Sequence, residues 1–414
     1  MSISTSTMLK IRAHSMTCYA TTRSARRETP AVIAGVFLIL MLAACAPQDS
    51  SGVAGGTRWQ PASNDDIVFT FAASASDETS LYALRRELSD NPSDAPRAAL
   101  YAMTALKSYA QSGDPRLLGY AAGALQNWQD VAAPPLDIWL LRGRLTQTEH
   151  RFADAAKDMD RLIAVHPGNA EALLLAADAW RRSGNVSAAR GRCLALSLSG
   201  HDPLARLCAA DVQLALGETA KAQTTAAQVI SDFANQLDDE ALAFAHAIHA
   251  EAATANGATD IALDSWAGAL AATPQPPLAL RLGRVDTLLE AKQYDAALRA
   301  LEDMPEADAV LLRRAIAGTA LQHPQLAAWR TALLQRFTDP AYTAEDSLHW
   351  RERALFELDV MQEPTSALRF AERNWAVQKG YEDAELLLRA AAAAGNDAAA
   401  QPVIAWRKAQ GGAT

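Results

Sequence analysis

Residues 136–169 read LDIWLLRGRLTQTEHRFADAAKDMDRLIAVHPGN, and this stretch decides the fold. It is rich in leucine and alanine at helical spacing, with almost no strand-like alternation. Small residues such as Gly143 and Ala155 let two helices approach closely. Pro167 ends the second helix, because proline cannot continue one. The stretch therefore predicts two helices joined by a turn.

The same pattern returns along the chain. Alanines at corresponding places are 34, 33, 40, 35, 31, 39 and 33 residues apart, and in four places a glycine precedes the alanine by five residues. Glycine suits the turn between two helices because its backbone is free to adopt conformations that other residues avoid. The alanines are Ala155, Ala189, Ala222, Ala262, Ala297, Ala328, Ala367 and Ala400; the glycines are Gly184, Gly217, Gly257 and Gly395; and Pro167, Pro274 and Pro340 each follow an alanine by 12 residues.

This repeat resembles the tetratricopeptide repeat, a helix–turn–helix unit of 34 residues. In the unit quoted above, five residues stand at the family's signature positions, namely Trp139, Gly143, Phe152, Ala155 and Pro167. The resemblance implies an all-α protein, an α-solenoid superhelix of about eight to nine such repeats. We expect the repeats to run from near residue 77 to the C-terminus, with a degenerate repeat at residues 99–133. The alternative is an alanine-rich helical bundle without the repeat.

The beginning of the chain carries an export signal. Residues 31–44, AVIAGVFLILMLAA, form an apolar run that follows the basic residues Arg23, Arg26 and Arg27 and precedes Cys45. This order is typical of a secretory signal peptide, and 14 apolar residues are fewer than the ~20 that span a membrane. The ending Leu-Ala-Ala-Cys resembles the bacterial lipobox, which implies removal of the leader and acylation of the cysteine. The alternatives are an ordinary cleaved signal peptide and an N-terminal membrane anchor.

These signals divide the chain into four parts. Residues 1–44 are the predicted lipoprotein signal peptide, and 45–65 are the lipidated cysteine with a flexible tether rich in Gly, Pro and Ser. Residues 66–135 hold N-terminal helices with the degenerate repeat, and 136–414 hold the main solenoid. Residue 46 is alanine rather than aspartate, which by resemblance implies sorting to the outer membrane, facing the periplasm.

Charge narrows the class of partner. The chain has a formal net charge of −9, of which residues 1–44 contribute +4, so the remainder carries −13. A protein this acidic without a basic run is a poor candidate for binding nucleic acid or anionic lipid. We expect membrane contact through lipid on Cys45 and a protein or peptide partner that is basic. The sequence indicates no oligomeric state.

Two cysteines remain in the folded part. Cys193 falls on the second helix of one repeat and Cys208 on the first helix of the next, and those helices pack together in a solenoid. In an oxidising compartment they form a candidate disulfide. Two buried free thiols are the alternative.

No motif in the sequence indicates catalysis or a cofactor. There is no HExxH, no phosphate-binding glycine loop and no nucleophile elbow. His246 and His249 have a spacing that suits one metal ion, but the sequence offers no third ligand. We therefore predict that the protein is not an enzyme and holds neither metal nor cofactor.

The repeat register also predicts a binding surface. In the tetratricopeptide architecture the first helix of each unit lines a concave groove, and the ninth residue of the unit points into it. Four consecutive repeats have a carboxylate there, with Arg181 and Arg182 at one end; the carboxylates are Asp178, Asp211, Glu251 and Asp286. Such a row favours a basic ligand through charge complementarity. Solvated side chains on a wet surface are the alternative interpretation.

Together these features predict a lipid-anchored periplasmic scaffold or adaptor that binds a protein or peptide partner, in the assembly of envelope machinery. The alternative is an accessory carrier that binds glycan, peptidoglycan or a small ligand in polysaccharide export.

Overall fold

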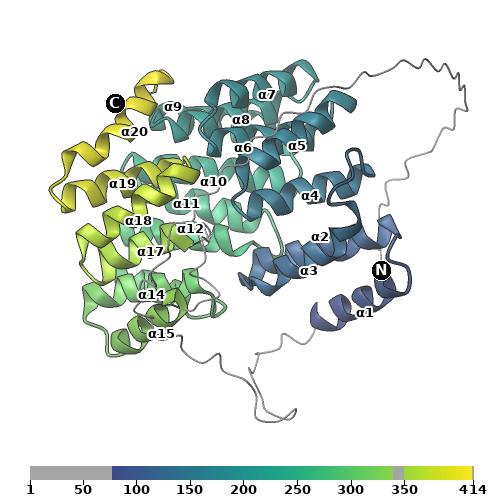
Figure 1. Ribbon diagram of the computed structural model, residues 1–414. Helices are drawn as coiled ribbons and strands as arrows, with labels where there is room; N and C mark the ends of the chain where they lie inside the picture. Colours follow the sequence, from purple (N-terminus) through teal and green to yellow (C-terminus); the bar gives the residue numbers. More distant parts are fainter. Residues whose placement is uncertain (1–76, 339–348, 413–414) are drawn as a thin grey trace, which may run out of the picture. The chain divides into compact units, whose positions relative to one another are not determined.

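The structure, a computed structural model, describes residues 77–338 and 349–412. In that part of the chain there are nineteen α-helices and no strand (Figure 1). The first nine are α1 (Asp77–Asp90), α2 (Ala95–Ser112), α3 (Arg116–Leu125), α4 (Leu136–Thr148), α5 (Phe152–Val165), α6 (Ala170–Arg182), α7 (Val186–Leu198), α8 (Asp202–Ala215) and α9 (Thr219–Phe233). The others are α10 (Asp239–Ala255), α11 (Thr259–Ala271), α12 (Leu278–Glu290), α13 (Tyr294–Leu301), α14 (Asp308–Leu321), α15 (Leu326–Thr338), α17 (Trp350–Leu355), α18 (Pro364–Val377), α19 (Tyr381–Ala393) and α20 (Gln401–Ala409).

After α1, these helices form nine antiparallel pairs, from α2/α3 to α19/α20. The first helices of neighbouring pairs (α4, α6, α8, α10, α12 and α14) also contact one another in order. They form a continuous surface that we call the inner face. The prediction of an all-α solenoid of eight to nine repeats is confirmed, and α2/α3 is the degenerate repeat.

The signature residues hold each pair together. Trp139 is buried, and its indole N–H donates a hydrogen bond of 2.9 Å to Asp158 on the partner helix. At Gly143 a Cβ atom would stand 2.5 Å from the terminal methyl of Met159. The helices therefore approach so closely that a larger residue at this position would displace the end of the Met159 side chain. Phe152 and Ala155 are buried in the same pair, and Ala189, Ala222 and Ala262 are fully buried in the next three.

One backbone position in the turn is left-handed in nearly every pair. Gly184, Gly217 and Gly257 have φ of 93°, 79° and 72° there. Lys292 and Gln362 occupy the same place without being glycine, both with φ of 58°. The fold thus imposes this conformation even where the residue type disfavours it.

The sixth repeat corrects one detail of the predicted register. Ala328, expected at the close-packed position, is exposed. In its place Trp329 lies against Gly318, where a Cβ would stand 2.7 Å from the indole ring, and Leu333 is buried instead. The large indole takes the space that the small residue takes elsewhere, so α15 packs with a different face.

The array of pairs coils back on itself, and pairs five to six places apart meet. Helix α2 contacts α12, and Gln111 donates a hydrogen bond to Gln275 of the preceding loop. Helix α19 contacts α8, and Figure 1 shows α19 and α20 beside the α7–α9 region. Each meeting joins the turns of an early pair to the loops or last helices of a later one.

The described helices include none that is long and apolar enough to cross a membrane. The predicted signal peptide, Cys45 and the tether lie outside the described residues, as does Pro340.

Candidate interaction surface

The four carboxylates predicted to line the groove come from consecutive first helices. Asp178 lies on α6, Asp211 on α8, Glu251 on α10 and Asp286 on α12, and these helices are neighbours on the inner face. The repeat register therefore places them in one row.

Arginines neutralise the first two. The Arg181 guanidinium, only 5% exposed, forms an ion pair with Asp178 and has its Nε 2.6 Å from an Asp211 oxygen. The Nε atom of Arg182 lies 2.9 Å from the Oδ2 atom of Asp178. Desolvation raises the pKa of Asp178, but Arg182 and Arg181 outweigh it and hold that pKa below its usual value. For Asp211 desolvation dominates, so its pKa is raised.

The last carboxylate of the row is also paired. Asp286 accepts two hydrogen bonds of 2.6 Å from the guanidinium of Arg313 on α14, a bidentate arrangement. Three of the four members of the predicted acidic row thus already pair with arginines of the same chain, which leaves less negative charge for a basic ligand. Arg181 and Arg182 stand within the row as partners of the carboxylates.

Glu251 is the exception. Desolvation, Glu382 of α19 and Asp211 together raise its pKa to about 8, although Arg181 and Arg182 oppose the shift. Glu290, at the end of α12, has its pKa raised to about 7 by desolvation, Asp286 and Glu382. Both carboxyls therefore release their protons at higher pH than an ordinary glutamate does.

Helix α19 covers this part of the inner face. Its Glu382 pairs with Arg351 of α17, and Tyr381 packs on Leu214, Ala222 and Ala252 of the early pairs. No local sequence pattern indicates this cover, because Tyr381 contacts residues more than a hundred positions away.

The opposite ends of the same first helices are open. Phe244 of α10 has 39% of its surface exposed, and Leu204 of α8, at the equivalent repeat position, is half-buried. Glu240, one helical turn before Phe244, is exposed. This open part of the inner face, defined by Leu204, Glu240 and Phe244, combines apolar and acidic side chains.

The two cysteines of the folded part meet. The Cys193 and Cys208 sulfurs are 2.01 Å apart and join α7 to α8, with both residues buried. The bridge links the second helix of one pair to the first helix of the next.

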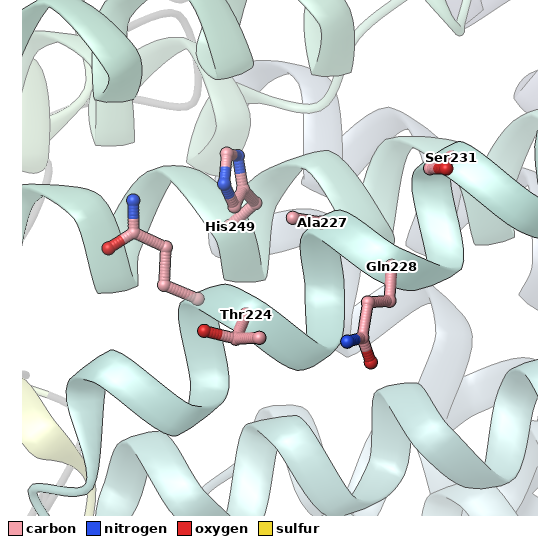
Figure 2. Close-up of a pocket in the computed structure, with 6 residues that line it drawn as sticks. Thr224, Ala227, Gln228, Ser231 and His249 are labelled. Atoms are coloured by element: carbon pink, nitrogen blue, oxygen red, sulfur yellow. The ribbon is translucent and has the colours of Figure 1, made fainter.

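A shallow hollow lies on the outside between α9 and α10. Its volume is ≈ 550 Å³, and Thr224, Gln228 and Ser231 line it together with His249 (Figure 2). The Nδ1 atom of His249 lies 2.7 Å from the Ser265 hydroxyl, so this ring already has a partner. Across the described ranges, no group of three or more His, Cys, Asp or Glu residues is placed to hold a metal ion.

No family model matches the sequence, and no curated protein matches it. Among solved structures, a tetratricopeptide repeat protein from Parabacteroides merdae is 14% identical, with a TM-score of 0.38, covering 59% of this chain and 95% of that one. The APC/C hetero-tetramer Cut9–Hcn1 is 16% identical with a TM-score of 0.38, covering 76% and 52%. The human IFIT1 dimer with m7Gppp-AAAA is 12% identical with a TM-score of 0.44, covering 80% and 85%. The fold assignment itself rests on the chain's own repeating helix pairs.

Proposed function

We propose that this protein is a lipid-anchored scaffold of the bacterial cell envelope, which binds a protein or peptide partner on the open part of its inner face. The observation that carries the proposal is the exposure of Phe244 beside Leu204 and Glu240 on neighbouring first helices. A solenoid offers its concave surface to extended partners. An exposed aromatic side chain with an acidic neighbour suits a segment that has an apolar anchor and a basic residue.

The charge balance supports a basic partner. Arginines of the chain neutralise most of the inner carboxylates, but the part after residue 44 keeps a formal charge of −13. Rim charges of this kind mainly speed the encounter with a partner of opposite charge.

Photo-crosslinking in cells tests the binding surface. A photoreactive amino acid replaces Phe244, and in a matched control it replaces Leu198 of α7, which is 80% exposed on another surface. We expect one crosslinked protein that forms at position 244 and not at 198. Equal crosslinking at both positions, or none at 244, would refute the location of the site.

Metabolic labelling with radioactive palmitate tests the anchor. The wild type and Cys18→Ser should take up label, whereas Cys45→Ser should not. Fractionation of the labelled cells then shows whether the protein enters the outer membrane. Label retained in Cys45→Ser would rule out lipidation at this residue.

A further inference from the structure

The last two pairs of helices close onto the turns of the second and third repeats through a small set of contacts, which we call the seam. The Lys379 backbone N–H donates a hydrogen bond of 2.8 Å to the carbonyl of Arg182. The Trp406 indole N–H donates one of 3.2 Å to the carbonyl of Gly184. Arg190 reaches the carbonyl of Gln410 at 3.3 Å.

Apolar contact across the seam is carried by two aromatic side chains. Trp406 packs on the cluster that contains Cys193 and Cys208, and Tyr381 packs on Leu214 and its neighbours. The C-terminal helices have their own core, whose buried residues include Leu387 and Val403, and Trp406 packs against both this core and the cluster of Cys193 and Cys208. Separation of the C-terminal helices from the early pairs therefore removes the Trp406 contact but leaves the buried residues of each core together.

We propose that the last two helix pairs, α17 to α20, act as a detachable clasp that covers the turn end of the inner face and uncovers it when the seam opens. The polar contacts of the seam are single hydrogen bonds to backbone carbonyls. Such contacts open at lower cost than a continuous apolar interface. Opening uncovers Arg181, whose guanidinium lies beside Gly380 of the clasp, 3.9 Å from where a Cβ atom on that glycine would stand. This opening goes beyond the proposed scaffold function, because the surface of Leu204, Glu240 and Phe244 is exposed while the clasp is closed.

A proton on Glu251 favours the closed seam, and its loss at higher pH leaves two negative carboxylates near each other. The closed clasp places Glu382 near Glu251, which also faces Asp211 of α8 and Arg181 and Arg182 of α6. Arg351 pairs with Glu382 and leaves Glu251 without an ion pair of its own. Because burial and these carboxylates raise the pKa of Glu251 to about 8, the closed state binds a proton that the open state releases. The seam is therefore tightest below about pH 5 and loosens as pH rises through about 8.

Hydrogen exchange of the intact chain tests the clasp. In Trp406→Ala, protection factors around Gly184 and Lys379 should fall at least tenfold together, while those of α4, α5 and α12 stay within twofold. Ile404→Ala, a truncation on the same helix at a residue 36% exposed, is the matched control and should change neither segment. Labelling of Arg181 by phenylglyoxal should rise at least fivefold in Trp406→Ala and not in Ile404→Ala.

The wild type provides a second test that needs no truncation. After correction for intrinsic exchange, protection at the seam should fall several-fold between about pH 6 and about pH 8.5, and Glu251→Gln should abolish this fall. A uniform loss of protection over all helices in Trp406→Ala would overturn the proposal, because the clasp would then be part of one cooperative unit. Unchanged protection at Gly184, or pH dependence that survives in Glu251→Gln, would overturn it as well. None of these measurements needs a partner, so failure here leaves the crosslinking test of the scaffold intact.

Discussion

Replacement of Arg181 by methionine should destabilise the protein strongly, since this one side chain neutralises carboxylates from two repeats. Its guanidinium is nearly buried, and it pairs with Asp178 on its own helix and Asp211 on the next. Removing one partner of a buried ion pair typically costs about 3–5 kcal/mol, because a charge is left buried without compensation. Arg182 still contacts Asp178, and the carboxylates keep 25% and 20% side-chain exposure, so we expect a loss near the lower end, about 3 kcal/mol.

Urea denaturation at neutral pH, followed by far-UV circular dichroism, measures this loss. Arg144→Met is the matched control, because Arg144 and its partner Glu171 are 47% and 40% exposed. An exposed pair of that kind contributes about 0–1 kcal/mol. A second substitution, Asp211→Asn, placed on Arg181→Met should recover part of the loss by removing one stranded charge. If Arg181→Met lost no more stability than Arg144→Met, the neutralised network would not stabilise the inner face and our reasoning would be wrong.

Three further predictions concern a proton, a turn and the disulfide. Because the pKa of Glu251 is raised in the folded state, the stability that its proton provides is fully present below about pH 4.5 and is lost as pH rises through about 8. In urea titrations, Glu251→Gln should match the wild type at pH 5. At pH 8.5 its free energy of unfolding should exceed that of the wild type by at least about 1 kcal/mol. Lys292→Gly should raise the free energy of unfolding by about 0.5–1 kcal/mol, and with it the melting temperature, because it relieves a left-handed lysine. Gly257→Ala should lower the free energy of unfolding by about 1 kcal/mol, and shifts of the same sign and size would contradict this account. Cys193→Ser should cost about 3 kcal/mol, as expected for opening a loop of 15 residues, and thiol counting on unreduced, denatured chain from residue 46 onward should find no free thiol.

The sequence predicts the repeating fold well because that information is local. The glycine of each turn and the buried alanine five residues later sit within one helix pair, where spacing alone reports them. The sixth repeat does not follow this pattern. There the large Trp329 of the second helix packs against the small Gly318 of the first, whereas in most other repeats the second helix has a buried alanine. The sequence also does not predict the left-handed backbone at Lys292, because lysine has no preference for that conformation.

The candidate interaction surface depends on contacts between helices that are far apart in the sequence, which local spacing does not report. Counting residues along the repeats puts the carboxylates on consecutive first helices, but it does not show that Asp286 is already paired with Arg313 of the next first helix. Arg181, three residues after Asp178, could have been recognised as a helical ion-pair partner. Its second contact with Asp211 needed the packing of adjacent repeats. No sequence spacing indicates that α19 covers this region.

The meeting of pairs five to six places apart has a consequence for how such a chain can evolve. In an open array each unit contacts only its neighbours, so duplication or loss of one unit leaves the remainder unchanged. Here the loss of a single unit between α4 and α12 would shift every later pair by one place, and Lys379 would no longer face Arg182. The number of units is therefore constrained by geometry, and we expect related chains to vary in loop length much more readily than in repeat number.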